Sequence, residues 1–465
     1  MATYLSLVLA TLLVAANANL FSTNQFYVNP TFQSNIDTAI LTTTDATTFA
    51  NLRIARNAPS AYWLDVISKV QVGSTELSTM DGILRDANKV APAKLTVFIV
   101  YDLPNRDCAA RSSNGEICCT TNADGTCNYQ VVGDCSSGLQ RYKTQYIDSI
   151  AKILSKYTSP IVLIIEPDSL PNLVTNAANP NCGNSATQTS YKEGVKYAVE
   201  KLSAFPNVQL YIDGAHGGWL GWQNNAQGFQ TLIQSLGILP KIKGFATNVA
   251  NYQPLGVACK KSLWCMPNSG HTGETCCADA CNLVNQWNPA NNEHNYVLEL
   301  SDMFPGKTFI IDTGRNGIHD ARKDCANWCN PRNTGMGQFP TAVTALPIVD
   351  AYYWLKTPGE SDGCTQVLPN GNLCARFDSM CASADSIGSI SPEPRVPEAG
   401  SWFDYQIKML AKNAKFGNIP TPIPVPTSMP TPVPTPVPTP VPTSMPTPVP
   451  ATSIWKCNQC SFVKK

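Results

Sequence analysis

The sequence predicts an α/β protein built around a parallel β/α barrel. Three features of its 465 residues support this fold class. Seven short runs of β-branched and aromatic residues recur along the chain, stretches with helical periodicity separate them, and polar side chains follow the runs. Buried strands that alternate with helices are typical of parallel sheets, and seven repeats favour a sheet closed into a barrel.

The seven runs are the expected strands, because each is short, apolar and bounded by polar clusters. They cover residues 61–65, 95–102, 161–168, 208–216, 242–251, 307–315 and 348–356. Between them apolar residues recur at helical spacing, as at positions 147, 150, 154 and 157 and again at 195, 199 and 202. This order of strand, helix and strand predicts that neighbouring strands run parallel.

Polar side chains gather at the carboxyl ends of these runs. In a parallel barrel those ends carry the loops that form the active site. A single aspartate at such a place is more often a helix N-cap or a solvated charge, but seven sites together predict one cleft. The candidates are Trp63, Asp65, residues 102–107, Asp168, Asp213, His216, Asn248, Asn251, Asp312, Arg315 and residues 356–362.

The first 18 residues have the pattern of a secretory signal peptide. An apolar run spans residues 5–15, and Ala16, Asn17 and Ala18 follow as a small-x-small sequence that a signal peptidase accepts. A membrane anchor is the alternative, but it needs about 20 apolar residues. We therefore expect cleavage after Ala18 and a secreted, extracellular protein with no membrane partner.

Eighteen cysteines fit an oxidising compartment. Those at 118–135 and 259–281 are crowded like metal ligands, but zinc sites usually include histidine at set spacings, and only His271 lies nearby. Disulfide-pinned loops are therefore expected, with no metal and no other cofactor. The formal charge is zero and charged residues make up 14%, which argues against nucleic acid as a partner and suits a neutral polymer.

The chain after residue 18 divides into three parts. Residues 19–416 have the length of one elaborated barrel and are the expected catalytic domain. Residues 417–452 are rich in proline and threonine and are the expected extended linker. Residues 453–465, with Trp455, Cys457 and Cys460, are too short to fold as a binding module. A small disulfide loop, an intermolecular thiol and a truncated module stay open for this tail.

Hydrolysis of a glycosidic bond requires two carboxyl groups with different pKa values. Asp168 directly follows an apolar run, and burial beside a second carboxylate such as Asp107 would keep it protonated near neutral pH. Asp168 is therefore the candidate acid.

The tryptophans outnumber what a barrel core needs, as expected of a cleft that binds the apolar faces of sugar rings. Trp219 and Trp222 lie among glycines in GGWLGW, which favours a binding surface over a core position. Trp402 lies in a helix-like segment and is expected in the core.

Six ordered motifs closely resemble glycoside hydrolase family 6, the cellobiohydrolases and endoglucanases that invert at the anomeric carbon. The motifs are VYDLPNRDCAA at 100–110, IEPDSLPNLVTN at 165–176, DGAHGGWLGW at 213–222, ATNVANY at 246–252, DTGRNG at 312–317 and LKTPGESDG at 355–363. The resemblance covers residues 24–416. It implies a distorted seven-stranded α/β barrel with a roofed active-site tunnel.

The resemblance also implies catalytic roles. Asp168 matches the general acid, and Asp107 matches the carboxylate that raises the pKa of the acid and steers ring distortion. Asp362 matches the aspartate often named as the base, whose role is contested because a water chain passes near Tyr101 and Ser113.

Substrate contacts and two disulfides are implied in the same way. Arg315 and Lys356 would keep Asp362 ionised, and Lys356 and Glu360 would bind sugars near the scissile bond. Cys108 would pair with Cys182, and Cys329 with Cys381. The remaining contacts are Trp63 and Asp65 in the glycone sites, Trp328 near the cleavage point, Trp219, His216 and Asn251 beyond it, and Trp222 at the tunnel entrance.

Three cysteine-rich segments depart from the family pattern, at about 116–136, 258–282 and 363–382. The first and third lie where the two roof loops of the family arise, so a retained roof is expected. The chain is therefore predicted to be a monomeric cellobiohydrolase that releases cellobiose from the non-reducing ends of cellulose and cello-oligosaccharides. The alternatives are an endo-acting glucanase of the same family and a non-catalytic cell-wall glucan-binding protein.

Overall fold

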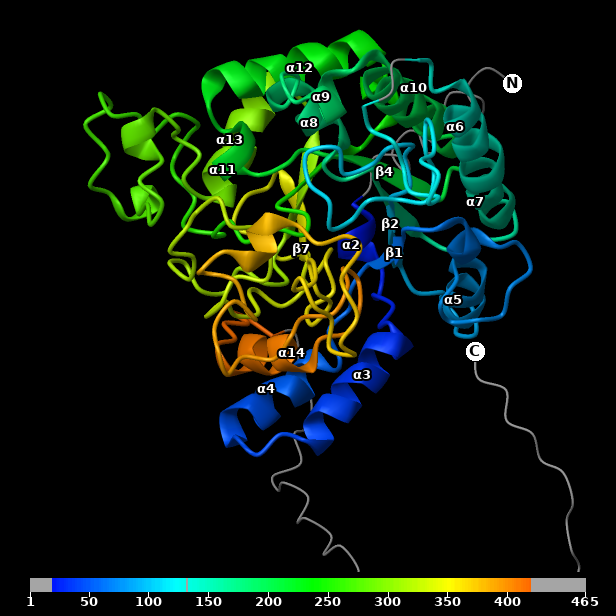
Figure 1. Cartoon of the computed structure of the whole chain (residues 1–465). Coiled ribbons are helices and arrows are strands. Elements are labelled where there is room, and N and C mark those ends of the chain that lie inside the picture. The colour runs from blue at the N-terminus through cyan, green and yellow to red at the C-terminus, as the bar shows by residue number, and fades with distance from the viewer. Residues whose placement is uncertain (1–18, 131–132, 420–465) are drawn as a thin grey trace, which may run out of the picture. The chain divides into compact units, whose positions relative to one another are not determined.

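A parallel sheet of seven strands forms the centre of the structure (Figure 1). The computed structural model describes residues 19–130 and 133–419, which belong to one unit, Met1–Pro426. All seven predicted runs form strands, and neighbours in the sheet follow the chain order. The strands are β1 (Tyr62–Leu64), β2 (Thr96–Val100), β3 (Ile161–Ile165), β4 (Val208–Asp213), β5 (Gly244–Thr247), β6 (Thr308–Asp312) and β7 (Val349–Tyr353).

Parts of the predicted domain organisation fall outside the described residues. These are the signal peptide at 1–18, the linker from residue 420 onward and the tail at 453–465. Within the described ranges, no helix has the length and apolar character needed to cross a membrane.

The barrel is distorted where its first and last strands approach each other. A parallel bridge joins Ser60 to Trp354 at this seam. The short helix α2 (Leu20–Thr23) also contacts β7, and its Phe21 packs edge-on against Tyr353 with 5.7 Å between ring centroids. Apolar packing therefore supplements this isolated bridge between the two ends of the sheet. Seven parallel strands in chain order confirm the predicted distorted seven-stranded barrel.

Successive residues of each strand face two different cores, which explains why the strands are apolar on both sides. In β2, Val97 and Ile99 belong to the core inside the barrel, whereas Phe98 and Val100 pack with the outer helices. The inward series continues beyond the strand to Tyr101, which lines a cavity. The end of a strand thus leads directly into the functional site.

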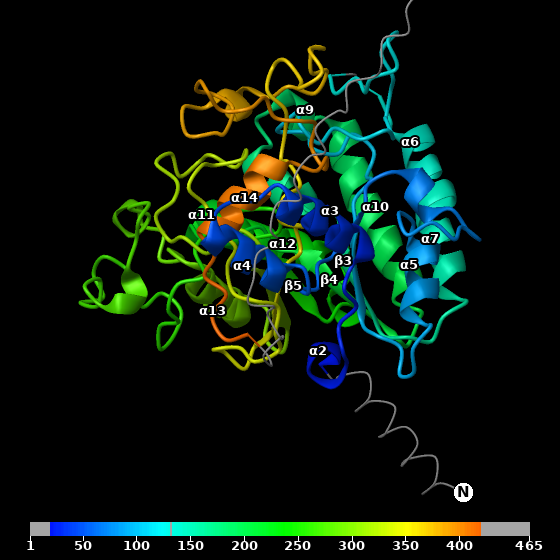
Figure 2. The same ribbon diagram turned by 90° about the horizontal axis from the view of Figure 1, so that it is seen from below.

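Most helices cover the outside of the barrel, and α3, α4 and α14 form a separate group that Figure 2 shows from below. Trp354, fully buried after β7, anchors this group by packing edge-on against Phe32 of α3 at 6.4 Å. The helices are α2 (Leu20–Thr23), α3 (Pro30–Leu41), α4 (Ala46–Ala55), α5 (Met80–Ala87), α6 (Ser136–Arg141), α7 (Asp148–Leu154), α8 (Ser169–Thr175), α9 (Pro180–Gly183), α10 (Ser185–Leu202), α11 (Gly217–Leu220), α12 (Gln223–Leu236), α13 (Glu293–Met303) and α14 (Asp404–Lys412).

The strands end earlier than the sequence predicted. β3 ends at Ile165, three residues before Asp168, and β4 ends at Asp213, three residues before His216. Glu166 and Asp168 have φ angles of 49° and 63°, left-handed values that cannot continue a strand. Non-glycine residues in this conformation are strained and cluster at functional sites. The backbone after β3 is therefore shaped for the site that follows.

Candidate active site

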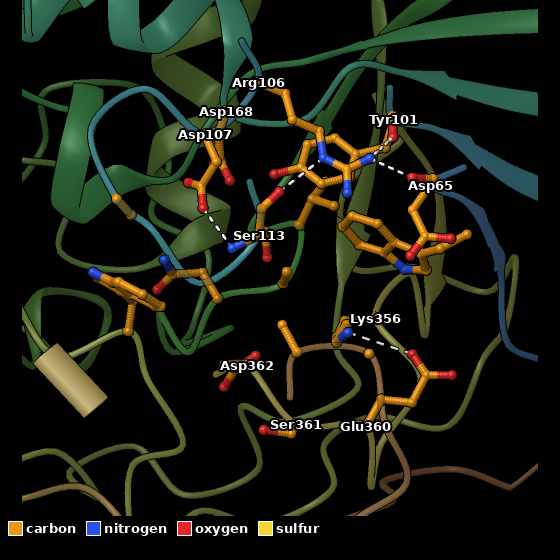
Figure 3. A pocket seen from close by; sticks show the side chains of 18 of the residues that line it. Asp65, Tyr101, Arg106, Asp107, Ser113, Asp168, Lys356, Glu360, Ser361 and Asp362 are labelled. Carbon is orange, nitrogen blue, oxygen red and sulfur yellow. Dashed lines mark hydrogen bonds and ion pairs between the residues drawn. The ribbon is translucent and has the colours of Figure 1, made fainter. Parts of the chain in front are cut away.

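A cavity of about 600 Å³ lies at the carboxyl ends of the strands (Figure 3). Most of its walls come from the segments that follow β1 to β7, as expected of a parallel barrel, and the start of α3 and β1 itself add to them. The structure brings fourteen of the predicted site residues together on these walls. They are Trp63, Asp65, Tyr101, Asp107, Ser113, Asp168, His216, Trp219, Trp222, Asn251, Trp328, Lys356, Glu360 and Asp362.

Asp168 lies between two further carboxyl groups. Its backbone N–H donates to Oδ2 of Asp213 at 2.9 Å, and Asp107 lies close by on the same side of the cavity (Figure 3). Burial raises the pKa of Asp168 well above its usual range, and the charges of Asp213 and Asp107 raise it further. Asp168 is thus held in the protonated form that a general acid requires.

Asp213 lies beneath the cavity wall instead of facing the cleft. It is buried at the end of β4, and burial raises its pKa to about 7. Because its carboxylate accepts the Asp168 N–H and interacts electrostatically with the Asp168 carboxyl, it positions Asp168 as well as tuning it.

Asp107 also has a left-handed backbone, with φ of 61°. Its Oδ2 accepts the backbone N–H of Ser113 at 2.7 Å. Burial raises the pKa of Asp107 to about 6, against the opposing effects of this hydrogen bond and of Arg106. Asp107 therefore takes up a proton at higher pH than an ordinary aspartate does.

Arg106, within the candidate range 102–107, is a buried cation that lines the cavity. Its Nη1 donates to the carbonyls of Asp65 and Tyr101 at 2.5 Å and to Oδ1 of Asp102 at 3.1 Å. The guanidinium also lies 4.5 Å from the centroid of the Tyr101 ring. Arg106 therefore fixes the loops after β1 and β2 against each other, and Asp102 is its partner beneath the cavity instead of a cleft residue.

Asp362 lies on the other side of the cavity from Asp107 and Asp168 in Figure 3. Its Oδ1 accepts from Nη1 of Arg315 at 2.6 Å, and its Oδ2 accepts from the Tyr252 hydroxyl at 2.5 Å and from the Asn330 N–H at 2.9 Å. Three donors from three segments thus fix the orientation of this carboxylate.

Arg315 does not line the cavity. It is 2% exposed and lies behind Asp362, as do the strand-end residues Asn248 and Asp312, which are also buried. Asp312 accepts backbone N–H groups of Ala250 and Lys356, at 3.1 and 2.9 Å. These side chains hold the loops instead of facing a ligand.

Lys356 is paired with Glu360, with Nζ 3.3 Å from Oε2, and not with Asp362. Its ammonium group also lies 5.2 Å from the centroid of the Trp63 ring. Burial raises the pKa of Glu360, with Lys356 opposing the shift. The structure therefore places Lys356 beside the Trp63 ring, while Arg315 is the counter-ion of Asp362.

Three tryptophans present flat surfaces to the cavity while their N–H groups are bound to protein. The Nε1 of Trp63 donates to the carbonyl of Leu355 at 2.9 Å, and that of Trp219 donates to Oγ1 of Thr175 at 2.8 Å. The Nε1 of Trp222 donates to a backbone carbonyl at 2.9 Å. Fixed rings with satisfied N–H groups suit stacking on sugar faces.

Trp402 was expected in the core, and the structure corrects this in part. It packs edge-on against Phe32 at 6.3 Å, but it also lines the cavity. Trp402 lies before α14 begins, in a segment that also contributes Ala399 and Gly400 to the cavity wall.

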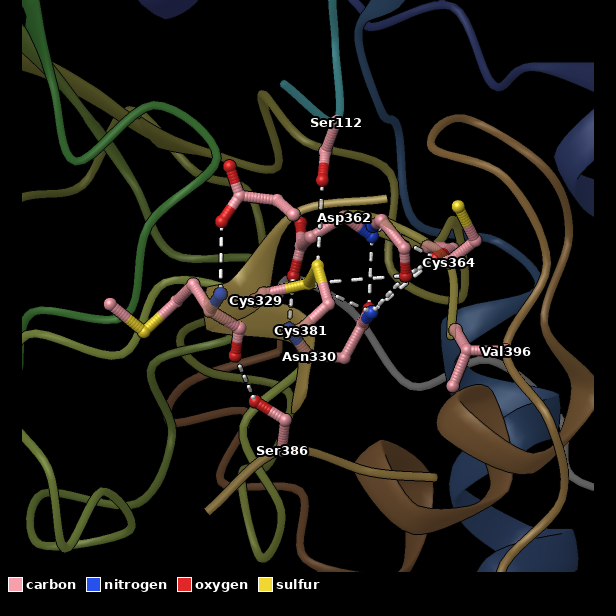
Figure 4. Close-up of a disulfide and its surroundings, with 12 residues drawn as sticks. Ser112, Cys329, Asn330, Asp362, Cys364, Cys381, Ser386 and Val396 are labelled. Atoms are coloured by element: carbon pink, nitrogen blue, oxygen red, sulfur yellow. Dashed lines mark hydrogen bonds between the residues drawn. A yellow bond between two sulfur atoms is a disulfide. The ribbon is translucent and has the colours of Figure 1, made fainter. Parts of the chain in front are cut away.

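Two loops meet across the cavity. The backbone N–H of Arg111 donates to Oδ2 of Asp378 at 3.0 Å, and Oγ of Ser112 lies 3.4 Å from Sγ of Cys381 (Figure 4). Asp107 and Ser113 on the first loop and Arg376 on the second line the cavity. These contacts form the roof that the family resemblance implied.

The roof itself differs in detail from the expectation. The described residues of this insertion, 116–130 and 133–136, contribute nothing to the cavity lining. This insertion supports the first loop from behind, since the Tyr129 hydroxyl donates to the carbonyl of Arg106 at 2.6 Å and accepts from Nδ2 of Asn114 at 2.8 Å.

Eight disulfides join the cysteines of the described chain. They include the two pairs implied by the family resemblance, and neighbouring cysteines bond to different partners. Cys457 and Cys460 lie outside the described residues. The pairs are Cys108–Cys182, Cys118–Cys127, Cys119–Cys135, Cys259–Cys276, Cys265–Cys277, Cys281–Cys325, Cys329–Cys381 and Cys364–Cys374.

Two cysteine groups have the proximity of metal ligands. One contains the four cysteines at 259, 265, 276 and 277, and the other contains Cys364 and Cys374 with Glu398. All six cysteines are in disulfides, so none offers a thiolate. These groups therefore lack the donor that a zinc site needs.

Several polar wall residues were not predicted. Asn172 and Asn176 lie inside the quoted motif at 165–176, so motif membership could have identified them. Lys69 lies four residues after Asp65 and pairs with it at 2.5 Å. Arg322 and Arg376 lie in irregular segments, where no periodicity marks a residue as part of a wall.

Comparison with known proteins identifies the family. Residues 21–414 match Glycosyl hydrolases family 6. The chain is similar to 1,4-beta-D-glucan cellobiohydrolase C of Emericella nidulans, with 36% identity over 87% of this chain and 80% of the relative. It is also similar to 1,4-beta-D-glucan cellobiohydrolase CEL6C of Podospora anserina, with 34% identity over 86% of this chain and 88% of the relative.

Solved structures support the same family. The catalytic core of the cellobiohydrolase Cel6A from Chaetomium thermophilum has a TM-score of 0.67 and 34% identity over 86% of this chain and 99% of that one. Cellobiohydrolase II (Cel6A) from Humicola insolens, in complex with glucose and cellotetraose, has a TM-score of 0.67 and 32% identity over 85% and 99%. With this fold, this cavity and these similarities, the chain belongs to glycosyl hydrolase family 6.

Proposed function

We propose that the chain hydrolyses β-1,4-glucosidic bonds of cellulose with inversion and releases cellobiose from non-reducing chain ends. The observation that carries this proposal is the placement of Asp168 and Asp362 on different sides of one roofed cavity (Figure 3). The relatives named cellobiohydrolase and the Cel6A structure with bound cellotetraose support the substrate class.

In this mechanism Asp168 donates its proton to the glycosidic oxygen as the bond from that oxygen to the anomeric carbon breaks. A water molecule attacks the anomeric carbon from the opposite face, and its proton passes to Asp362, directly or through water near Tyr101 and Ser113. One displacement inverts the configuration, so the first product is the α-anomer. Solvent then returns a proton to Asp168 and removes one from Asp362.

The polar wall residues would bind the sugar hydroxyls in this proposal. Burial and the positive charge of Arg322 lower the pKa of His216 to about 3, so His216 is neutral and acts through hydrogen bonds. Burial raises the pKa of Asp65, but Lys69 and Arg106 outweigh it and keep Asp65 ionised. The two side chains would therefore recognise hydroxyls in different ways.

The other residues of the cavity wall are assigned to sugar positions along the proposed substrate chain. Trp63 and Asp65 would hold the glycone, and Trp328 would lie near the cleavage point. Trp219, His216 and Asn251 would bind the leaving chain, with Trp222 at the entrance. Lys356 and Glu360 would bind sugars near the scissile bond.

The products distinguish the proposed exo action from endo action. We expect cellobiose as the main product of swollen cellulose and little loss of viscosity from carboxymethylcellulose. Proton NMR of the first turnover of cellotetraose is expected to show α-cellobiose before mutarotation. A rapid fall in viscosity would favour an endo-acting enzyme, and a β-anomeric first product would refute inversion.

Secretion and a monomeric state are part of the same proposal. The eight disulfides of the described chain support an oxidising, extracellular location. Cleavage after residue 18, the linker at 417–452 and the tail at 453–465 are proposed from sequence. The N-terminal sequence of the secreted protein tests the cleavage site.

Replacing Asp107 by asparagine is expected to move the alkaline limb of the pH–rate profile to lower pH. The raised pKa of Asp168 arises from burial and from the charges of Asp213 and Asp107, in that order. Loss of the Asp107 charge lowers that pKa, so Asp168 loses its proton at lower pH and activity falls sooner as pH rises. The measurement is kcat/KM for cellotetraose as a function of pH.

A matched control is Asp124→Asn, an exposed aspartate on the insertion behind the roof. It removes the same charge outside the cavity and is expected to leave the limb unchanged. An Asp107→Asn profile with the limb in place, or moved to higher pH, would contradict the assigned tuning role.

A further inference from the structure

Trp287 is an exposed tryptophan in a strained conformation. Its side chain is 54% exposed, and its φ angle is 63°. Bulky residues rarely adopt this left-handed conformation, whereas glycine adopts it freely. The left-handed backbone is strained, and the large apolar ring stays in contact with water. Backbone strain of this kind concentrates at functional sites.

The segment that presents Trp287 is held in place. Its N–H donates to the carbonyl of Val284 at 3.0 Å, and the N–H of Asn288 donates to the carbonyl of Leu283 at 3.0 Å. The disulfide between Cys281 and Cys325 closes the segment at its start. The indole is therefore carried by a fixed turn, which reduces the entropy lost when a ligand binds.

The same segment is joined to the cavity wall at two points. Cys325 itself lines the cavity. The carbonyl of Gln286, the residue before Trp287, accepts the Nε1 hydrogen of Trp222 at 2.9 Å. Trp222 also lines the cavity. Trp287 is therefore the next residue along the chain after Gln286, which holds a tryptophan of the cavity wall.

We propose that Trp287 extends the glucan-binding surface beyond the cavity and stacks on a glucosyl unit of the single β-1,4-glucan chain that passes Trp222. The proposal rests on the proposed function, since it takes the same polymer as ligand. Continuity with the cavity wall identifies the occupant. Asn285 and Gln286, which directly precede Trp287, are exposed, and their amide nitrogens donate within the turn to Asn282. Their side-chain carbonyl oxygens would accept from sugar hydroxyls, as a neutral polymer requires.

The test measures affinity as a function of chain length. Asp168→Ala protein, in which turnover is expected to be slow, is titrated calorimetrically with cello-oligosaccharides from cellobiose to cellohexaose, with and without Trp287→Gly. Glycine relieves the left-handed strain, so misfolding does not account for a loss. We expect about three- to tenfold weaker binding of the longest chains and a loss that shrinks as the chain becomes too short to reach Trp287.

Two variants sharpen the test. Trp287→Phe keeps a flat ring and is expected to retain most of the affinity. Leu263→Ala is the matched control, because Leu263 is an exposed apolar residue of the cysteine-rich insertion with φ of 56° but without a flat face. It is expected to bind every chain length as the parent does.

The outcomes separate this inference from the proposed function. Equal affinity of Trp287→Gly and its parent for long chains overturns the inference while the proposed function stands. A loss of equal size at every chain length, or the same loss in Leu263→Ala, also overturns it. A parent that binds no cello-oligosaccharide overturns the proposed function and the inference together.

Discussion

Replacement of Asp168 by alanine is expected to lower the rate of cellotetraose hydrolysis by about 100-fold or more, the usual cost of removing a general acid. Without this carboxyl, the glycosidic oxygen departs without a proton. Burial raises the pKa of Asp107 to about 6, but its Oδ2 is already bound to the Ser113 N–H at 2.7 Å. It therefore does not replace the missing proton donor. Initial rates by product quantification measure the effect.

The leaving group distinguishes loss of an acid from general damage. Fluoride departs from β-cellobiosyl fluoride with little need of protonation, so Asp168→Ala is expected to hydrolyse this substrate with a much smaller loss. An equal loss on both substrates would show that Asp168 does not act as the proton donor.

Glu166→Gln is the matched control. Glu166 is a second buried carboxyl after β3, two residues away, and burial raises its pKa to about 7. Its oxygens accept from the Tyr142 hydroxyl at 2.8 Å and from two backbone N–H groups. An amide disturbs those bonds, so we expect a lower free energy of unfolding, by about 1–3 kcal/mol, instead of the loss of an acid.

The barrel was predictable because its strands are apolar on both faces and alternate with helices. Their ends were not predictable. The predicted strand included residues 166–168, which directly follow the apolar run of β3, but Glu166 and Asp168 are left-handed. The hydrogen bonds of the fold, such as that from the Asp168 N–H to Asp213, decide this conformation. Propensity alone carries no information on such a turn.

Disulfide pairing shows a similar limit. Cys118 and Cys119 are neighbours, yet one bonds to Cys127 and the other to Cys135. Adjacent cysteines point in different directions, so their partners depend on how the loop folds over its support. Spacing predicts that such loops are pinned, but it leaves many connectivities open.

The carboxylates of the site were predictable, whereas their surroundings were less so. The strand-end rule predicts that Asp168, Asp213 and Asp312 share one end of the barrel. It does not predict which of them faces the cavity. Of these three, only Asp168 lines the cavity. Asp213 and Asp312 instead accept hydrogen bonds from backbone N–H groups of neighbouring loops. Which carboxylate binds these N–H groups depends on how the loops pack, and the sequence at one strand end does not show it.

Replacement of Asp362 by alanine is expected to lower hydrolysis by about 100-fold or more on cellotetraose and on β-cellobiosyl fluoride alike. Water must still lose a proton when it attacks, whatever the leaving group. The variant also leaves the buried Arg315 guanidinium without its carboxylate. Breaking such a pair from one side costs about 3–5 kcal/mol, so the free energy of unfolding, measured by urea titration, is expected to fall as well.

Azide separates the chemical role of Asp362 from this structural role. The azide ion has no proton to lose, so it needs no base when it attacks the anomeric carbon in place of water. We expect azide to restore turnover of the fluoride by Asp362→Ala and to give α-cellobiosyl azide. Tyr252→Phe is the control, because it removes one donor to Asp362 but keeps the carboxylate, and azide should not accelerate it. If azide restored nothing in Asp362→Ala while the protein stayed folded, Asp362 would act by holding Arg315 and the loop around it, and the base would have to be sought in the water near Tyr101 and Ser113.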